Sequence, residues 1–400
     1  MIEELIGIHA EVMRTTPLLV HRYLWDKINW DARVICLFGD RGVGKTTLMC
    51  QYLLKKYKSV SQALYISADN INVIADGLFT TAKDFFSHGG QALFIDEIHK
   101  YPDWSIELKN IIDTYGKHQI IFSGSSTLDL QHSKGDLSRR VVYYKIPGLS
   151  FREYLNLHIG LDMPAMRFED LLKQHVGFAE KLQGKTILKH FNDYLEHGYY
   201  PYFVEGVTDY LSKINNTIEK IIFEDLAVVY RLKPATLTTL KRVLWLIATS
   251  EGLIPNIDSL SKNFAISRES IYDALEYLDK SGLTRNLYAS ASGMKFIRKP
   301  GKIYLHNTNL LYAINGTLKT NHSIGVVRET FFVNQVANAC KISLHDAGDY
   351  LIDERFVIEV GGRGKTKKQI KHQEKAYLAV DGIEIGFGTK IPLYLFGFLY

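Results

Sequence analysis

A glycine-rich stretch near the N-terminus constrains the fold of this chain more than any other feature. Residues 34–38 are all apolar, which is typical of a strand buried on both faces of a sheet. They lead directly into the spacing G-x-x-x-x-G-K-T, from Gly39 to Thr46. Residues 48–57 then place apolar side chains at helical intervals. A strand, this loop and a helix in this order predict a phosphate-binding P-loop, rather than a glycine-rich turn that binds nothing.

The residue types in this loop fit a polyphosphate ligand. The glycines allow the backbone N–H groups to turn inward, and the positive end of the following helix favours an anion. Lys45 is expected to reach the β- and γ-phosphates, and the Thr46 hydroxyl to complete the shell of a Mg²⁺ ion. The predicted nucleotide-binding set is Gly39, Arg41, Gly42, Val43, Gly44, Lys45, Thr46 and Thr47.

Two carboxylates follow a second buried strand about fifty residues later. Residues 92–95 are apolar and run into Asp96 and Glu97, which is the Walker B pattern. We expect Asp96 to hold Mg²⁺ through an outer-sphere contact and Glu97 to polarise the attacking water. Two surface acids at a strand end are the alternative. Their distance from the P-loop, in a chain that alternates strands and helices, favours nucleotide hydrolysis.

Polar residues after the next strand are candidates for further catalytic roles. Ser125 and Ser126 follow residues 119–123 and are expected to contact the γ-phosphate or the water, unless they form a plain serine-rich turn. Arg139 and Arg140 precede the strand predicted at residues 141–144. Arg140 is a candidate catalytic arginine that stabilises transition-state charge, in its own subunit or in a neighbouring one; a surface ion pair is the alternative.

Composition sets limits on the class of protein. A chain of 400 residues predicts two or three domains, and 23% charged residues are ordinary for a globular chain. No run of eighteen apolar residues is present, and the acidic N-terminus does not fit a secretory signal. The three cysteines show no metal-binding spacing. We therefore expect a cytoplasmic protein that does not enter a membrane.

The middle of the chain predicts a helix-turn-helix. Residues 257–264 and 268–280 have helical periodicity, with Ser267 as the N-cap of the second helix. Strands of a wing are predicted at residues 283–288, 295–298 and 303–305. If the module reads DNA, the groove would be contacted by Arg268, Ser270 and Tyr272, and the phosphates by Lys295, Arg298 and Lys299. Because the second helix also carries Glu269, Asp273, Glu276 and Asp279, a protein-binding or interdomain module is the alternative.

A resemblance extends over these motifs. The P-loop, residues 93–97, 122–126 and 138–140 belong to a whole superfamily, whereas Ile-Pro-Gly-Leu-Ser-Phe-Arg-Glu-Tyr-Leu at 146–155 and His-Gly-Tyr-Tyr-Pro at 197–201 are more specific. Together they resemble a family of prokaryotic predicted AAA+ ATPases. The resemblance implies a helical lid over the nucleotide at residues 149–205. It also implies ATP as the nucleotide, in agreement with the absence of a guanine-specific N-K-x-D stretch.

In the related ATPases, the last hundred residues resemble the PD-(D/E)xK nuclease fold. Asp349 and Glu359 match its two acids, and Glu329 matches the acid of its first helix, so three carboxylates would converge on Mg²⁺. The lysine expected two residues after Glu359 is Gly361. Substitution by Arg363 or Lys365 from the glycine-containing loop is the alternative, but we expect a degenerate domain without nuclease activity.

Positive charge is concentrated in the same part of the chain. Residues 291–400 hold 15 Lys and Arg against 9 Asp and Glu, a net +6, while the other residues net −1. A nucleic acid partner is one interpretation, and an acidic protein or a solvated surface is the other.

The prediction is an α/β protein with a P-loop NTPase parallel sheet and lid, a winged helix-turn-helix and a nuclease-like α/β domain. The predicted domains are an ATPase core at 1–148, a lid at 149–205, a helical linker with the winged helix at 206–300, and the PD-(D/E)xK-like domain at 301–400. The expected function is Mg-ATP hydrolysis coupled to binding of DNA or a protein partner, with homo-oligomer formation as an option. The alternatives are a nucleotide-gated scaffold and an ATP-coupled nuclease.

Overall fold

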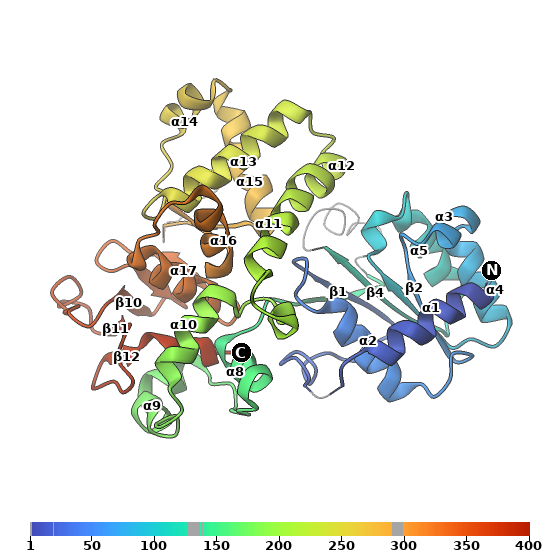
Figure 1. The fold of residues 1–400 in the computed structure, drawn as a ribbon, viewed down its shortest axis with the longest axis horizontal. Coiled ribbons are helices and arrows are strands. Elements are labelled where there is room, and N and C mark those ends of the chain that lie inside the picture. The colour runs from blue at the N-terminus through green and yellow to red at the C-terminus, as the bar shows by residue number, and fades with distance from the viewer. Residues whose placement is uncertain (1, 19, 126–136, 138, 290–298) are drawn as a thin grey trace. The chain divides into compact units, whose positions relative to one another are not determined.

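The computed structural model describes residues 2–18, 20–125, 137, 139–289 and 299–400. Contacts divide the chain into two units, Met1–Gly148 and Leu149–Tyr400 (Figure 1). No helix in the described residues is both long enough and apolar enough to cross a membrane.

The first unit is built on a parallel sheet in the order β2-β3-β4-β1-β5, which confirms the predicted fold class. Because all its strands are parallel, their carboxyl ends lie at the same edge of the sheet. Its strands are β1 (Val34–Gly39), β2 (Ala63–Ser67), β3 (Ala92–Asp96), β4 (Gln119–Ser125) and β5 (Val142–Lys145). Its helices are α1 (Ile2–Thr15), α2 (Lys45–Lys56), α3 (Ile71–Asp76), α4 (Leu78–Ser87), the short η1 (Ile98–Lys100) and α5 (Trp104–Thr114).

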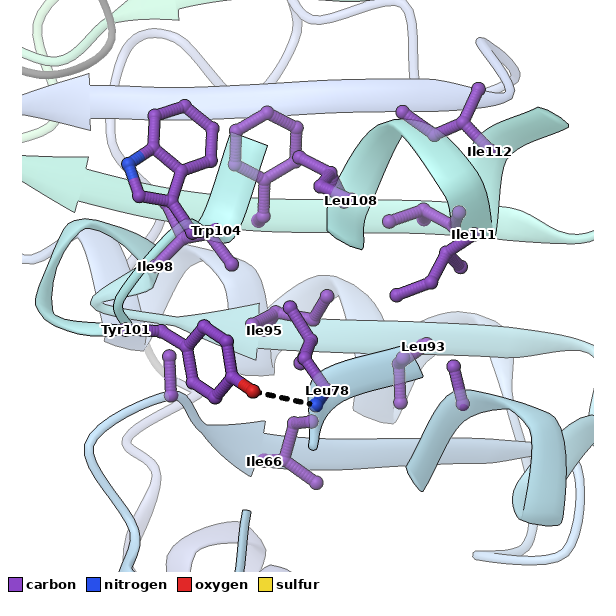
Figure 2. Close-up of a cluster of buried hydrophobic side chains, with 14 of the residues drawn as sticks. Ile66, Leu78, Leu93, Ile95, Ile98, Tyr101, Trp104, Leu108, Ile111 and Ile112 are labelled. Atoms are coloured by element: carbon purple, nitrogen blue, oxygen red, sulfur yellow. Dashed lines mark hydrogen bonds between the residues drawn. The ribbon is translucent and has the colours of Figure 1, made fainter. Parts of the chain in front are cut away.

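The sequence of the central strands explains their position. β1 and β3 are apolar along almost their whole length, β4 is apolar at residues 120–122, and all three are almost entirely buried, as strands covered on both faces must be. Side chains from β2, β3, α4 and α5 form one core (Figure 2). At its border, the Tyr101 hydroxyl accepts the N–H of Leu78 at 3.2 Å and donates to Glu107 at 2.9 Å, so the start of α4 is tied to α5. This core fixes the carboxyl ends of the strands, where the polar motifs lie.

The second unit combines a helical part with a second sheet of order β12-β11-β10-β9-β8. Its first elements are α8 (Phe151–Ile159), α9 (Phe168–Glu180), α10 (Ile187–His197), η2 (Pro201–Glu205), α11 (Tyr210–Lys220), η3 (Ile221–Leu226), α12 (Ala227–Val229) and α13 (Pro234–Thr249). They are followed by α14 (Ile257–Phe264), α15 (Arg268–Lys280), β6 (Thr284–Leu287), β7 (Lys302–Leu305), α16 (Thr308–Leu318) and α17 (Ile324–Val336). The chain ends with β8 (Ile342–Leu344), β9 (Tyr350–Ile352), β10 (Phe356–Gly361), β11 (Ala376–Val380), β12 (Lys390–Pro392) and η5 (Leu393–Phe398).

The segment that carries the more specific part of the resemblance has a structural role. Ser150 is the N-cap of α8 and forms a capping box with Glu153. The Ser150 hydroxyl and the Arg152 Nε also donate to the main-chain oxygen of Tyr400, at 2.7 and 2.9 Å. This segment therefore binds the last residue of the chain within the second unit. The proposal that residues 149–205 act as a lid over a nucleotide stays a prediction.

The helices predicted for the helix-turn-helix are present as α14 and α15. The side chain of Ser267 accepts the N–H of Ser270 and caps α15, as its position in the sequence predicts. Arg268 forms an ion pair with Asp258 at 2.6 Å. β6 and β7 pair antiparallel, while Lys295 and Arg298 lie outside the described residues. Assignment of this region as a winged helix stays a prediction.

Candidate nucleotide-binding site

The P-loop connects the end of β1 to the start of α2. Gly44 is the N-cap of α2 and has φ 91°, a left-handed conformation that glycine adopts without strain. A Cβ atom at Gly39 would overlap the carbonyl oxygen of Ile146, so only glycine fits there. The buried Arg22 donates to the carbonyl oxygens of Val43 at 2.5 Å and Pro147 at 2.7 Å. These contacts hold the loop in a defined shape within the first unit.

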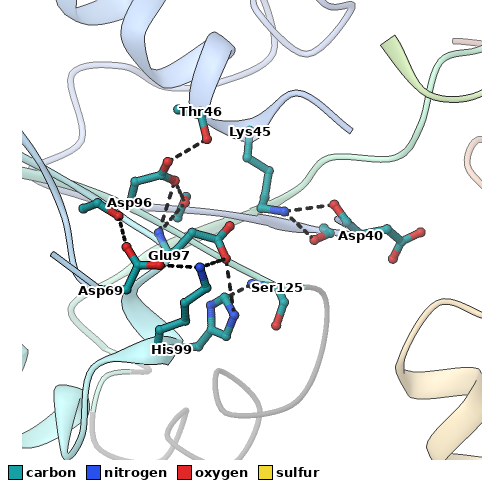
Figure 3. Close-up of polar contacts among 12 residues, drawn as sticks. Asp40, Lys45, Thr46, Asp69, Asp96, Glu97, His99 and Ser125 are labelled. Carbon is teal, nitrogen blue, oxygen red and sulfur yellow. Dashed lines mark hydrogen bonds and ion pairs between the residues drawn. The ribbon is translucent and has the colours of Figure 1, made fainter. Parts of the chain in front are cut away.

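Lys45 lies inside this loop. Its side chain is buried, and its Nζ donates to the carbonyl oxygens of Gly39 and Asp40, both at 2.9 Å (Figure 3). Burial lowers the pKa of Lys45, while the nearby carboxylates of Glu97 and Asp96 act in the opposite direction. An ammonium group at a helix N-terminus is suited to bind a phosphate.

Asp96 is the centre of a buried hydrogen-bond cluster. The Thr46 hydroxyl donates to its Oδ2 at 2.6 Å, and the Tyr65 hydroxyl donates to the same oxygen at 3.1 Å. The Ser123 hydroxyl donates to Oδ1. Burial, followed by the charge of Asp96, raises the pKa of Tyr65 well above its usual range. The Thr46 hydroxyl and the Asp96 carboxylate are oxygen ligands of the kind that Mg²⁺ prefers, so these two residues fit the predicted metal role.

Glu97 has a backbone conformation that is uncommon for a side chain of its type, with φ 51°. Its N–H donates to Asp96 Oδ1 and to the Ser123 hydroxyl, both at 3.1 Å, which stabilises this conformation. Its Oε2 lies 3.5 Å from His99 Nε2 and 3.8 Å from Lys100 Nζ. The Glu97 side chain is 21% exposed, so the carboxylate remains accessible to water.

Ser125 reaches this cluster through its backbone. Its N–H donates to His99 Nδ1 at 3.2 Å, so the ends of β3 and β4 are connected by the His99 ring (Figure 3). Of the predicted site residues, the structure thus brings Lys45, Thr46, Asp96, Glu97 and Ser125 to one edge of the sheet. Ser126 lies outside the described residues.

Arg140 lies elsewhere in the first unit. It precedes β5, which is parallel to β1, so it lies at the edge of the sheet opposite the P-loop. Its guanidinium forms an ion pair with Asp113 at 2.7 Å, near the end of α5. Arg140 therefore lies away from the P-loop of its own chain. Its catalytic role in a neighbouring subunit stays a prediction.

Sequence reasoning missed several residues of the cluster. Ser123 follows three apolar residues of β4 and Tyr65 lies between apolar residues of β2, and a polar side chain in a buried strand was the available signal. His99 and Lys100 lie two and three residues after Glu97, but a short distance in sequence does not reveal that they face its carboxylate. Asp69, which binds Lys100 at 2.5 Å, gave no such signal.

The arrangement of carboxylates in the second unit differs from the predicted Mg²⁺ site. No group of three His, Cys, Asp or Glu side chains suited to a metal ion occurs in the described residues, although the charges of Glu329 and Glu359 both act on Asp349. Glu329 binds Lys302 Nζ and the Tyr304 hydroxyl instead, both at 2.6 Å. Lys302 thus pairs with the charge of Glu329, and Tyr304 donates a hydrogen bond to it.

The two strand acids are held separately. Asp349 accepts the N–H of Val360 at 2.7 Å, and burial raises its pKa to about 6, with the nearby charges of Glu359 and Glu329 acting in the same direction. Glu359 is 2% exposed and forms an ion pair with Lys365 at 2.5 Å. Lys365, in the loop that follows Gly361, is thus the lysine that pairs with this acid, and its substitution for the motif lysine stays a prediction.

Comparisons with known proteins support the assignment of the first unit. Residues 31–155 match the family model described as AAA domain, and residues 188–321 match a domain of unknown function, DUF8612. A protein of Methanocaldococcus jannaschii named Uncharacterized protein MJ1637 is 27% identical, with 94% of this chain and 89% of that protein covered.

Among solved structures, AMPPCP-bound DnaA from Aquifex aeolicus is 14% identical, with 69% of this chain and 88% of that chain covered and a TM-score of 0.26. PCH-2 of C. elegans is 19% identical, with 43% and 48% covered and a TM-score of 0.23. Residues 31–155 are therefore similar to the AAA domain family, and the geometry of the P-loop agrees with that similarity.

Proposed function

We propose that this protein binds and hydrolyses Mg-ATP at the carboxyl edge of the first sheet. The observation that carries this proposal is that three kinds of side chain needed for ATP hydrolysis lie around one loop. A buried lysine lies in the P-loop, a hydroxyl–carboxylate pair joins Thr46 to Asp96, and the partly exposed Glu97 lies beside them. This set of groups matches the requirements of phosphoryl transfer to water.

The chain's own residues would divide the reaction as follows. Lys45 exchanges its carbonyl partners for phosphate oxygens, because charged oxygens are the stronger acceptors. Thr46 and Asp96 would hold Mg²⁺, which supplies positive charge to the phosphate oxygens when it is bound. Glu97 takes a proton from water while the water oxygen bonds to the γ-phosphorus. The bond from that phosphorus to the bridging oxygen breaks, and ADP and phosphate leave.

The direct test is Mg²⁺-dependent phosphate release by the wild type and Glu97→Gln, with ATP binding measured in parallel. We expect the Glu97→Gln variant to bind ATP with unchanged affinity and to lose hydrolysis by about 100-fold or more. Glu180→Gln makes the same chemical change at an exposed position of α9 and should leave both unchanged. Absence of hydrolysis in the wild type would refute the enzymatic proposal and favour a nucleotide-gated scaffold.

We further propose that the second unit binds the partner whose contact is coupled to the nucleotide, and that this partner is a nucleic acid. Residues 363–375, between β10 and β11, contain six Lys and Arg and one acid. Lys367, Lys368 and Lys371 are exposed, while Ile370 is buried and anchors the segment to the sheet. An anchored basic segment supports phosphate-backbone binding.

The nucleic acid proposal is tested by the salt dependence of duplex DNA binding. Replacing Lys367, Lys368 and Lys371 by Gln should reduce the slope of log affinity against log salt by about 2 to 3. Replacing the exposed Lys181, Lys185 and Lys189 by Gln removes the same charge elsewhere in the second unit and should have a smaller effect. ATP hydrolysis that DNA and RNA do not change would instead favour a protein partner. A homo-oligomer, in which Arg140 acts on a neighbouring subunit, is also part of the proposal.

A further inference from the structure

The His99 ring contacts residues at the ends of two neighbouring strands, β3 and β4. It lies on η1, two residues after Glu97, and its side chain is only 7% exposed. One ring nitrogen, Nδ1, accepts the backbone N–H of Ser125 at the end of β4. The other, Nε2, lies 3.5 Å from the Glu97 carboxylate at the end of β3. The ring therefore spans the distance between the catalytic base and the neighbouring strand.

The contact with Ser125 also defines where the ring proton lies. A backbone N–H can only donate, so Nδ1 must be the unprotonated acceptor. In the neutral ring, the proton then lies on Nε2, which faces Glu97 Oε2. At 3.5 Å this nitrogen makes an electrostatic contact with the carboxylate and not a hydrogen bond, and the position of the ring depends on the Ser125 backbone.

Lys100 also lies near the Glu97 carboxylate, but its closest partner is Asp69, which follows β2. Its Nζ lies 3.8 Å from Glu97 Oε2 but only 2.5 Å from Asp69 Oδ2, and Asp69 also accepts from the Ser67 hydroxyl at 2.5 Å. Lys100 is therefore held by the end of β2. Of these two neighbours of the Glu97 carboxylate, His99 is the one whose described contact leads to β4, whereas the Ser123 hydroxyl of β4 contacts the Glu97 backbone.

The order of the strands indicates what the contact of His99 with both strand ends could do. β4 lies between β3, which carries Glu97, and β1, which leads into the P-loop. A γ-phosphate held by the P-loop would therefore approach the end of β4. We propose that His99 is a positioning residue that links the position of the Ser125 backbone to the direction of the Glu97 carboxylate. Water activation then depends on whether a γ-phosphate is present. This inference rests on the proposed ATP hydrolysis.

Two substitutions separate the two contacts of the ring. In His99→Asn, the amide oxygen can replace Nδ1 and accept from Ser125, but the shorter side chain does not reach Glu97. In His99→Gln, the amide N–H can replace Nε2, but the acceptor for Ser125 is lost. Because the link needs both contacts, each variant should lower kcat by about 10- to 100-fold. The affinity for ATP, measured with Glu97→Gln as reference, should change less than twofold.

The control is His88→Gln, because the His88 side chain is 76% exposed near the end of α4 in the same unit. It should retain the wild-type kcat and ATP affinity. A second measurement adds His99→Asn to Glu97→Gln and follows the residual rate in a single turnover. Since His99 acts through Glu97, the double variant should be no slower than Glu97→Gln alone.

The outcomes distinguish this inference from the proposed function. A wild type without Mg²⁺-dependent hydrolysis refutes the proposed function, and this inference with it. An active wild type together with unchanged kcat in either His99 variant refutes the link alone. A parallel loss of ATP affinity and kcat, or a further loss in the Glu97→Gln background, would show a structural role and also overturn it.

Discussion

Replacing Asp349 by Asn should stabilise the second unit at neutral pH. The side chain of Asp349 accepts the Val360 N–H at 2.7 Å, and an Asn side-chain oxygen can accept the same bond. The fold disfavours the charged form, since burial, together with the charges of Glu359 and Glu329, raises the pKa of Asp349 to about 6 although the Val360 N–H acts in the opposite direction. Asn keeps the shape and the hydrogen bond and removes the charge.

The sign and size of the effect follow from the two pKa values. The folded pKa is about 6 and the ordinary value is 3.8, so the folded state binds more protons than the unfolded state between these limits. Asp349 therefore reduces stability progressively as the pH rises from about 4 to about 6, and the reduction is complete above that range. The shift corresponds to about 3 kcal/mol at most, and partial exposure of the carboxyl reduces this to about 1 to 2 kcal/mol.

The assay is calorimetric unfolding of the wild type and Asp349→Asn at pH 4 and pH 7.5. Addition of ADP should shift the transition of the first unit, which distinguishes it from that of the second. The Asn variant should raise the second transition by several degrees at pH 7.5 and by much less at pH 4. A lower transition temperature at pH 7.5, or the same difference at both pH values, would show that the charge of Asp349 is favourable in the folded state.

Two further predictions concern buried polar groups. Lys365→Met should destabilise the second unit by about 3 kcal/mol, because it leaves the carboxylate of Glu359 buried without its ion pair; equal stability in urea unfolding would contradict this. Ser123→Ala should lower the rate of ATP hydrolysis by about 10-fold, because the Ser123 hydroxyl orients both Asp96 and the Glu97 N–H. The exposed Ser87→Ala serves as control, and an unchanged kcat in Ser123→Ala would refute this role.

The P-loop and the Walker B strand could be located from sequence because their signals are local. The spacing from Gly39 to Thr46, an apolar run and two acids lie within short segments, and the parallel sheet then brings them together. The cap at Ser267 is predictable for the same reason. Partners that are distant in sequence are a different case. Tyr65 donates to Asp96 across 31 positions, and only the pairing of β2 with β3 brings them into contact.

The carboxylates of the second unit show why matching a motif did not predict their contacts. The alignment of Glu329 with a metal-binding acid says nothing about Lys302 and Tyr304, which lie on a preceding strand and bind it. A carboxylate with a cation at 2.6 Å has little reason to share a metal ion with a second acid. A sequence pattern can identify an acidic residue such as Glu329, but the cation closest to it in the fold determines its binding partner.

Gly361 and Lys365 are best explained together. A Cβ atom at Gly361 would lie 2.8 to 2.9 Å from the side-chain carbons of Lys365, so the lysine passes through the space that any larger residue at 361 would need. Glycine at 361 is therefore a requirement for the ion pair between Lys365 and Glu359. A lysine at 361 would displace Lys365 and compete for the same buried carboxylate. The absence of a lysine at position 361 and the ion pair between Lys365 and Glu359 thus depend on the same packing. A position-by-position comparison of sequences would not reveal this dependence.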